Sequence, residues 1–402
     1  MNKKISLGLA ISLILISATA SFAVTMTYSQ RIYNRLIPSF SSRTAMYSAI
    51  AELDELIRRE YYGEIDQNSL NAKLADGYVR GLGDISSFYM TAPQYLEYSE
   101  RILGKLPGVG ITVEPNPLTG FLTVTEIFPD SPAAAEGLEK FDEIIKIGND
   151  TVTKENSAAM AGKLSGKELS SVSLTYRRDG NDKAISVLIG YEAKSVAYER
   201  VGEFGYVKIT AFYENTLEQF DKAIAELLKQ GAKSFIFDVR NTTEGTIEYA
   251  ANVLDRLVPS PTEGEQALAK AYDKNGKVIE TYQSDANDMT QKMVVLINAK
   301  TAGGAELFAC DLRDFGKADL IGGKTKGNGK LQKVYPLDDG SAVMLTVAVL
   351  KPYSGRVYDG DGAGIEPDFE VSLTAEQEKS PGMPKLEDDA QFQAAYNWLS
   401  EG

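Results

Sequence analysis

The stretch INAKTAGGAELFACDLRDFG, residues 297–316, decides which fold class the chain favours. An apolar strand runs into a turn of small residues, and an amphipathic segment follows the turn. Many enzymes present a nucleophile at such a junction of strand, turn and helix. No serine occurs from Asp285 through Gly340, however, and the turn holds Gly303 and Gly304. The stretch therefore has the form of a catalytic turn without a serine nucleophile.

Strands alternate with helices on the N-terminal side of this stretch as well. YVKITAF is followed by TLEQFDKAIAELLKQG (residues 206–231), and SFIFDVRN is followed by TIEYAANVLDRLV (residues 234–258). This alternation predicts a mainly parallel sheet that helices cover on both faces. Ligands bind beyond the carboxyl ends of the strands in such folds. Those ends are DVRNTTEG (238–245) and INAKTAGG (297–304), so we expect the functional site there.

The chain before residue 194 is organised differently. Apolar residues recur at steps of three and four from Thr44 to about Arg80, which predicts helix. From residue 108 to about residue 193, short apolar runs are separated by Gly, Asn, Asp and Pro, which predicts a small β-rich module. Within this module Ser131 and Pro132 open a short predicted helix, as its N-cap and first residue.

Composition excludes several classes of site. The net charge of −14, from 42 basic and 56 acidic residues, argues against a nucleic-acid partner, which needs concentrated Lys and Arg. The chain has no histidine, which excludes Ser-His-Asp and Cys-His catalysis and every His-ligated metal site. Cys310 is the only cysteine, and its apolar neighbours predict a buried thiol rather than a reactive one.

The N-terminus carries a targeting pattern. Lys3 and Lys4 precede an apolar run from Ile5 to Val24, which fits a cleaved signal peptide or an uncleaved membrane anchor. Both imply export, with the positive charge kept on the cytoplasmic side. We therefore expect a protein that works outside the cytoplasm, either secreted or held at the inner membrane by its N-terminus.

The order of these modules resembles the carboxyl-terminal processing proteases, which are PDZ-containing serine peptidases of the S41 type. The resembling segments occur in family order, and they are LIRREYYGEIDQNSLNAKLADGYVRGLGDISSFYMTAPQYLEY (56–98), GVGITVEPNPLTGFLTVTEIFPDSPAAAEGLEKFDEIIKIGND (108–150), GYVKITAFYENTLEQFDKAIAELLKQGAKSFIFDVRN (205–241) and VYPLDDGSAVMLTVAVLKPYSGRVYDGDGAGIEPDFEV (334–371).

The resemblance implies an α/β multidomain fold with a mainly parallel sheet in the peptidase core. Its expected parts are a signal peptide or membrane anchor (1–27), a helical segment (28–103), a PDZ domain (104–193), an S41-type core (194–374) and a C-terminal tail with an amphipathic helix (375–402).

The chemistry of this family uses a serine whose proton is taken by an uncharged lysine, which a glutamine holds in place. Desolvation lowers the pKa of such a lysine, so histidine is not needed. The family's nucleophile turn reads approximately S-A-S-A-S-E, and its lysine segment reads approximately G-K-G-S-V-Q. Laid on INAKTAGGAE and GNGKLQ, these patterns put Gly303 at the serine, Asn328 at the lysine and Gln332 at the glutamine. The resemblance thus implies a degenerate site.

The expected oxyanion hole is a third place where this sequence differs from the family pattern. The family's DLRNNPGG is DVRNTTEG here, which puts Glu244 at a glycine whose amide would stabilise the oxyanion, with Gly304 as the other position. A carboxylate at this point opposes the stabilisation of a developing oxyanion. The alternative for Glu244 is a first-turn acid that the helix dipole favours. Gln332 taken alone is most simply a polar strand residue.

Displaced groups are the alternative source of catalysis. Thr301 lies two residues before Gly303, and Lys326 and Lys330 flank Asn328 at steps of two, which strand alternation would place on its face. Either lysine would lie about 6–7 Å from Asn328 along the strand. A nucleophile and its base must approach to about 3 Å. The simpler expectation for Thr301 is a helix N-cap.

A PDZ domain binds a peptide C-terminus as an added strand, and here the Gly108–Ile111 amides (Gly108, Val109, Gly110 and Ile111) would take its carboxylate. The leading hypothesis is a pseudopeptidase that binds polypeptide C-termini and assists an active paralogue or forms a homo-oligomer. The alternatives are a slow tail-specific peptidase and a structural assembly protein. No cofactor and no metal is expected.

Overall fold

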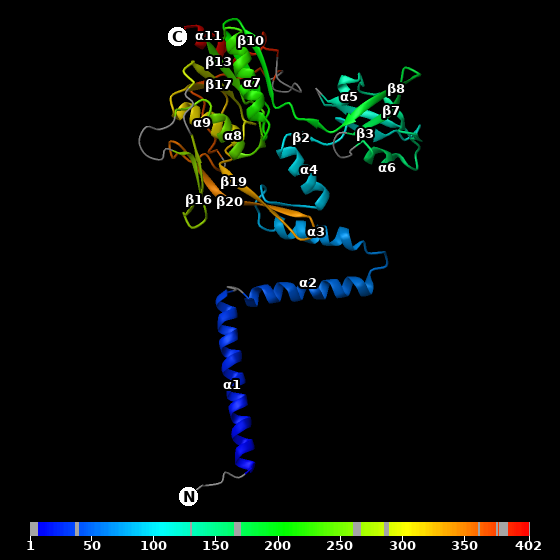
Figure 1. The fold of residues 1–402 in the computed structure, drawn as a ribbon, viewed down its shortest axis with the longest axis vertical. Helices are drawn as coiled ribbons and strands as arrows, with labels where there is room; N and C mark the ends of the chain where they lie inside the picture. The colour runs from blue at the N-terminus through cyan, green and yellow to red at the C-terminus, as the bar shows by residue number, and fades with distance from the viewer. Residues whose placement is uncertain are drawn as a thin grey trace. The chain divides into compact units, whose positions relative to one another are not determined.

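The computed structural model describes residues 7–36, 40–128, 131–164, 170–259, 267–284, 289–360, 362–374, 377 and 385–401 (Figure 1). The chain divides into two compact units, residues 1–74 and residues 75–402.

The first unit is helical. Its elements are α1 (Leu7–Leu36), α2 (Phe40–Glu60) and the start of α3 (Gln67–Arg80). The helical pattern from Thr44 to Arg80 is therefore two helices, and Asp66 begins the second by accepting the N–H groups of Asn68 and Ser69 at 2.9 and 3.2 Å. Lys3 and Lys4 lie outside the described residues. None of the described helices has both the length and the apolar composition to cross a membrane, so the expected N-terminal membrane helix is not supported.

A short linking region precedes the β-module. Its elements are β1 (Phe88–Met90), α4 (Ala92–Ile102), β2 (Lys105–Leu106) and, after the module, β9 (Tyr191–Glu192), which pairs with β2. The backbone N–H of Thr91, the N-cap of α4, donates to Gln94 Oε1 at 2.9 Å. The side chain of this glutamine thereby closes the first turn of α4.

The β-rich module between residues 108 and 190 is confirmed. Its sheet has the order β3-β4-β5-β7-β8, with β6 beside β5. The elements are β3 (Ile111–Pro115), β4 (Leu122–Ile127), α5 (Pro132–Ala135), β5 (Glu143–Ile147), β6 (Asp150–Thr151), α6 (Ser157–Gly162), β7 (Ser170–Arg178) and β8 (Asn181–Ile189). Ser131 caps α5 as predicted, since its hydroxyl accepts the Ala134 N–H at 3.2 Å. β3 is an edge strand, and α6 packs beside it.

The core that follows is built on a six-stranded sheet of order β10-β11-β13-β17-β18-β21. The elements are β10 (Val196–Val201), β11 (Phe204–Ile209), β12 (Ala211–Phe212), α7 (Thr216–Lys229), β13 (Ser234–Asp238), β14 (Glu244–Gly245), α8 (Ile247–Leu254), β17 (Met293–Ile297), α9 (Gly304–Asp314), β18 (Ala318–Gly322), β21 (Phe369–Glu370) and α11 (Ala390–Glu401).

Both faces of this sheet are covered, as the alternating pattern predicted. Side chains from α7, α8 and α9 form one buried cluster with one face of the strands, and α11 forms a second cluster with the opposite face. Phe235 and Phe237 belong to the first cluster, whereas Ile236 belongs to the second. Successive residues of a strand point to opposite faces, which accounts for this division.

A second core sheet is antiparallel and was not anticipated. It has the order β1-β20-β15-β16, with β19 also paired to β20. The added strands are β15 (Ala267–Tyr272), β16 (Val278–Gln283), β19 (Lys330–Pro336) and β20 (Ala342–Pro352). Only β10 is antiparallel in the six-stranded sheet, but most described strand pairings in the whole chain are antiparallel. The prediction of a mainly parallel sheet therefore holds for the six-stranded sheet and is wrong for the second core sheet, in which every described pairing is antiparallel.

Candidate functional site

The carboxyl ends of β13 and β17 lie side by side, since Asp238 pairs with Leu296 in parallel register. The loops that follow these strands meet at a cleft of about 560 Å³, which is where the parallel pattern placed the site. The cleft also receives side chains from α4, β16, β19 and β20. Its lining residues are Phe88, Tyr98, Arg101, Ile102, Tyr213, Thr243, Glu244, Gly245, Thr246, Ile247, Glu248, Glu280, Tyr282, Gly303, Gly304, Asn328, Lys330, Leu331, Gln332, Lys333, Val334 and Met344.

Gly303 stands at the sharp turn between β17 and α9. It is the N-cap of α9, with φ 62° and ψ −117°. A residue with a side chain adopts this conformation only at a cost of about 1–3 kcal/mol. A Cβ atom placed on Gly303 would meet only Asn328 Nδ2, at 3.8 Å. The positions matched to the serine and the lysine thus face each other across open space, and they hold a glycine and an asparagine.

Glu306, in the first turn of α9, joins this turn to the loop that carries Asn328. Its buried carboxylate accepts the N–H groups of Gly303, Gly327 and Asn328 at 3.0, 2.7 and 2.8 Å, and also the hydroxyl of Thr325. Burial raises the pKa of Glu306, and these four donors oppose that rise. Because every partner is a donor, the arrangement suits the ionised carboxylate.

Gln332 lies on β19 and lines the same cleft as Asn328. Its Nε2 atom is buried and has no hydrogen-bond partner among the described residues. An unpartnered buried amide is uncommon because it has lost its hydration without replacement. Gln332, the residue matched to the lysine-holding glutamine, therefore offers the cleft an amide that contacts no lysine among the described residues.

Glu244 is bound on both carboxylate oxygens. The hydroxyl of Tyr213 donates to its Oε2, and Arg101 of α4 lies 3.6 Å from its Oε1. Burial, and next the hydrogen bond to Glu244, raises the pKa of Tyr213. The first-turn explanation of Glu244 is wrong, because Glu244 lies in β14 and the first-turn acid of α8 is Glu248. Glu244 instead occupies a wall of the cleft as one half of an ion pair.

The groups considered as displaced catalysts are not brought together. Thr301 is fully buried, and its hydroxyl donates to the Val239 carbonyl at 3.0 Å and accepts the Asn298 N–H at 3.0 Å. The expectation that Thr301 caps α9 is wrong, since Gly303 does so. Lys326 is exposed and is not among the residues that line the cleft, whereas Lys330 lines it with its Nζ 3.9 Å from Asp84.

Gly304, the other oxyanion position, is the first residue of α9, so its N–H has no acceptor within the helix. It is tightly enclosed, since a Cβ atom there would lie 3.0 Å from both the Ala250 Cβ and the Thr246 carbonyl oxygen. This amide therefore stands at the base of the cleft, where α8 and α9 meet.

The predicted carboxylate loop of the β-module is partly closed. Gly108 and Gly110 both have positive φ, as tight loops require. The N–H of Val109, however, donates to the Leu164 carbonyl at 3.2 Å, just after α6. The Val109 amide is therefore not available to a peptide in this conformation. Ile111 begins edge strand β3, which remains suited to strand addition.

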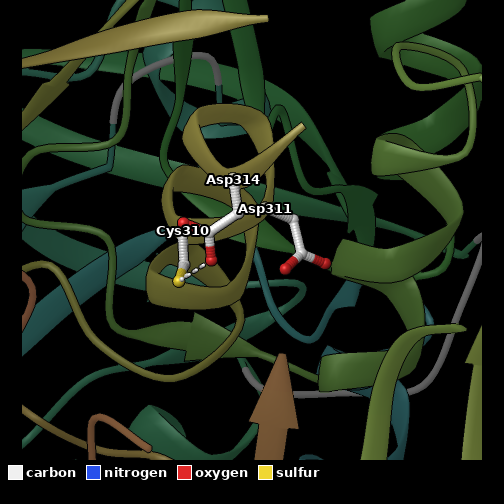
Figure 2. Close-up of side chains that lie close together, drawn as sticks. All are labelled: Cys310, Asp311 and Asp314. Carbon is white, nitrogen blue, oxygen red and sulfur yellow. Dashed lines mark hydrogen bonds between the residues drawn. The ribbon is translucent and has the colours of Figure 1, made fainter. Parts of the chain in front are cut away.

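One group of side chains has the composition of a metal site. Ligand atoms of Cys310, Asp311 and Asp314, all on α9, lie within 4.8 Å of one another (Figure 2). The Cys310 thiol donates to Asp314 Oδ2 at 3.3 Å, and Asp311 accepts the Tyr353 N–H at 3.1 Å. Burial raises the pKa of Cys310, which disfavours the thiolate form that metals bind. Cys310 is the buried thiol that the sequence predicted.

Glu306 was not singled out from the sequence. A glutamate three residues after an N-cap is a recognisable capping signal, and Gly303 and Glu306 have that spacing. The spacing alone does not indicate a capping box, because the N-cap residue of that motif is normally serine or threonine and here it is glycine.

Two family models match the chain. The model of peptidase family S41 matches residues 203–371, and the PDZ-domain model matches residues 107–189. The carboxyl-terminal-processing protease of Picosynechococcus sp. is 29% identical over 375 residues, which are 88% of this chain and 87% of that protein. The carboxy-terminal processing protease CtpA of Bacillus subtilis is 28% identical over 344 residues, 84% and 72% of the two chains.

The chloroplastic carboxyl-terminal-processing peptidase 3 of Arabidopsis thaliana is 29% identical over 337 residues, which are 77% of this chain but only 63% of that protein. The match to the probable CtpA-like serine protease of Staphylococcus epidermidis likewise covers 64% of its length. The fold and these matches define a serine-peptidase domain that carries a PDZ domain. The chain is thus a homologue of the carboxyl-terminal processing proteases, with an S41 peptidase domain at residues 203–371 and a PDZ domain at residues 107–189.

Proposed function

We propose that this chain is a pseudopeptidase that binds the C-termini of polypeptides and does not hydrolyse them. The observation that carries the proposal is the pair of facing positions in the cleft, where Gly303 supplies no hydroxyl and Asn328 supplies no amine. A serine-lysine mechanism needs both, within about 3 Å of each other. The unpartnered amide of Gln332 supports the same conclusion.

The polar groups that remain in the cleft favour binding over catalysis. Lys333 lies 2.6 Å from Glu280, and Lys330 faces Asp84, so both lysines are held by carboxylates. The Glu244 carboxylate would oppose an oxyanion. Apolar residues such as Ile102 and Met344 line the same cleft and suit an apolar peptide end.

The PDZ domain supplies the second binding surface. Strand β3 lies at the sheet edge with α6 beside it, which is the arrangement that adds a peptide as an extra strand. Matches to carboxyl-terminal processing proteases support polypeptide tails as the ligand class. We propose that such a tail is presented to an active paralogue.

The test uses an unstructured protein that ends in apolar residues, with a C-terminally amidated copy as its control. We expect the chain to bind the free carboxylate form, measured by fluorescence anisotropy, and to bind the amidated form at least tenfold more weakly. Mass spectrometry should show no trimming after prolonged incubation. Cleavage of the tail would establish the slow peptidase instead, and a chain that neither binds nor cleaves would be structural.

We also propose that the protein acts outside the cytoplasm, on the basis of Lys3, Lys4 and the apolar run after them. A reporter enzyme that is active only after export, fused after Gly402, should be active. The control replaces both lysines and three leucines of the run with glutamate, and it should abolish reporter activity. An equally active control would contradict export by this segment.

A further inference from the structure

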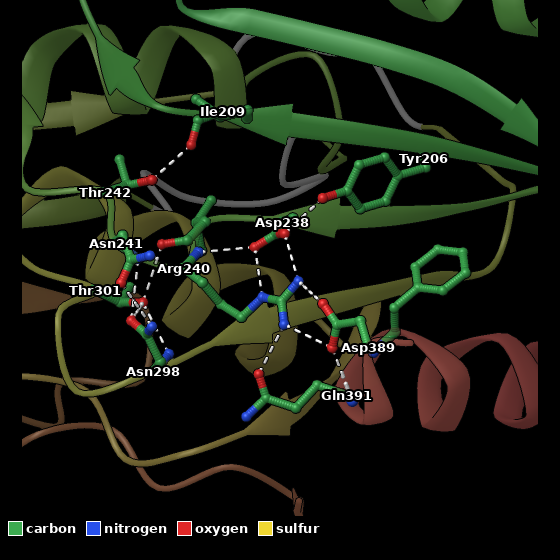
Figure 3. Close-up of polar contacts among 12 residues, drawn as sticks. Tyr206, Ile209, Asp238, Arg240, Asn241, Thr242, Asn298, Thr301, Asp389 and Gln391 are labelled. Atoms are coloured by element: carbon green, nitrogen blue, oxygen red, sulfur yellow. Dashed lines mark hydrogen bonds and ion pairs between the residues drawn. The ribbon is translucent and has the colours of Figure 1, made fainter. Parts of the chain in front are cut away.

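Arg240, at the end of β13, is the centre of a fully buried ionic cluster (Figure 3). Its guanidinium donates from Nε and Nη2 to the two oxygens of Asp238, at 2.9 and 2.7 Å. It also contacts Asp389 Oδ2 at 2.7 Å and donates to Gln391 Oε1 at 2.8 Å. Tyr206 completes the cluster by donating its hydroxyl to Asp238 at 2.6 Å.

The cluster depends on all of its members. One cation faces two carboxylates, and the side chains of Arg240, Asp238 and Asp389 are all 0% exposed. Burial opposes every one of these charges, yet Arg240 keeps the pKa of Asp238 below its ordinary value. Removing one member of such a buried set leaves a charge without its partner, which is strongly unfavourable.

The backbone on either side of Arg240 is joined to the turn that precedes Gly303. The Val239 carbonyl accepts the Thr301 hydroxyl at 3.0 Å, and the Thr242 carbonyl accepts the Ala302 N–H at 3.0 Å. Asn241 and Asn298 exchange two further hydrogen bonds, which Figure 3 also shows. The segment from Val239 to Thr242 therefore lies between the ionic cluster and the turn that precedes Gly303. It continues directly into the cleft wall at Glu244.

Asp389 and Gln391 come from the start of α11, which lies beyond the S41-matched residues 203–371. We infer that Asp389 and Gln391 are positioning residues for the cleft: through Arg240 they hold the loop after β13 against the turn at Gly303. The start of the C-terminal helix α11 thus supports the loops that form the cleft, so this helix is not a separate tail. Gln391 reinforces the link, because its Nε2 donates to the Val371 carbonyl at 2.7 Å.

Asp389 has a second role that the test must separate from the first. Its Oδ1 accepts the N–H groups of Gln391 and Phe392 at 3.0 and 3.1 Å, so it caps α11. Serine and asparagine cap helices about as well as aspartate. Asp389→Ser therefore keeps a cap and removes the contact with Arg240, whereas Asp389→Asn keeps the size, the cap and one oxygen. Asp388 is exposed and adjacent, so Asp388→Ser is the matched control.

The experiment measures hydrogen–deuterium exchange of the full-length chain and each variant. In Asp389→Ser we expect amides of residues 241–246 and 301–306 to exchange at least tenfold faster, with those of β7 and β17 unchanged. Asp389→Asn should show the same pattern more weakly, and it carries the test if Asp389→Ser does not fold. Asp388→Ser should match the parent chain. Unchanged cleft amides, or equal acceleration throughout the core, would overturn the inference.

A second readout rests on the proposed function. The apolar-ended polypeptide should protect cleft amides from exchange, and Asp389→Ser should need about tenfold more of it for half-protection. Unchanged half-protection in Asp389→Ser would overturn the inference. If the parent chain shows no protection at all, the proposed function fails, while the exchange pattern of the variants still decides the role of Asp389.

Discussion

Gly303 combines a backbone conformation that opposes side chains with an open space where a side chain would fit. Its φ of 62° and ψ of −117° are of the kind that functional turns hold under strain. Glycine adopts them without that strain, so the turn is relaxed with glycine at position 303. The nearest neighbour of an added Cβ is the amide of Asn328, at ordinary contact distance. The proposed lack of peptidase activity therefore rests on two side chains rather than on the shape of the cleft.

This leads to a restoration experiment. Gly303→Ser combined with Asn328→Lys should produce measurable cleavage of an apolar-ended polypeptide, detected by mass spectrometry. Gln332 is already present to hold the new lysine. Adding Glu244→Gly should raise the rate further, because a carboxylate near the oxyanion is removed. The control, Gly303→Ala with Asn328→Lys, has the same backbone strain without the hydroxyl, and its activity would contradict this account.

Glu306 is the residue on which the shape of the turn depends. Glu306→Gln replaces an acceptor-only group with one that bears an NH₂, so at least one of its backbone N–H partners loses its acceptor. We expect a loss of about 2–4 kcal/mol in the free energy of unfolding, measured by urea denaturation. Glu280→Gln, at a half-buried ion pair, should cost less than about 1 kcal/mol. Equal losses in Glu306→Gln and Glu280→Gln would contradict the view that the turn depends on the Glu306 carboxylate.

Helices α8 and α9 meet at Gly304, and their close approach sets the floor of the cleft. A Cβ at this position would lie 3.0 Å from both Ala250 Cβ and the Thr246 carbonyl oxygen, closer than ordinary contact. Neither neighbour is the end of a flexible side chain, so the two helices would have to separate. The glycine is therefore required by packing between elements rather than by its own dihedral angles.

Gly304→Ala should accordingly destabilise the protein by about 1–3 kcal/mol despite the better helix propensity of alanine. The matched control is Gly162→Ala in α6, where an added Cβ meets nothing within 4 Å. That substitution should be neutral or slightly stabilising. Thermal unfolding of both variants distinguishes them, and a neutral Gly304→Ala would contradict the packing argument.

The chain as a whole contains buried acids whose ionisation links stability to pH. Asp311 is the clearest case, since burial, and also the nearby Asp314, raises its pKa well above the ordinary value. The unfolded chain then releases this proton at a lower pH than the folded chain does. The contribution of Asp311 to the free energy of unfolding is therefore fully present below about pH 4. It is lost as pH rises toward the pKa of the folded state, with a limiting slope of about 1.4 kcal/mol per pH unit.

Asp311→Asn keeps the acceptor for the Tyr353 N–H and cannot ionise. The variant should therefore lose less stability than the parent between pH 5 and pH 8, and it should be more stable at neutral pH by about 1–3 kcal/mol. Urea denaturation at several pH values measures this difference. Asp388→Asn, at an exposed position, should follow the parent curve. Parallel curves for the parent and Asp311→Asn would contradict the assigned pKa direction.

Local signals predicted local structure well. Apolar alternation marked the strands of the PDZ domain, and Ser131 with Pro132 marked the start of α5, because both depend on neighbours in sequence. The expected capping role of Thr301 and the first-turn explanation of Glu244 are wrong, because the partners of both residues are distant in the chain. Thr301 is bound to Val239, and Glu244 is bound to Tyr213 and Arg101. A residue type at a helix start predicts a cap only when no such partner is present.

The sequence by itself determined the resemblance to the carboxyl-terminal processing proteases, the order of the modules, and the glycine and asparagine at positions 303 and 328, since these are properties of residue identity and spacing. Only the tertiary structure decided that Gly303 and Asn328 face each other, that Glu306 joins their two loops, and that Asp389 reaches Arg240 from 149 residues away. Contacts of this kind depend on how separate elements pack. Their partners have no fixed spacing along the chain, so no local pattern encodes them.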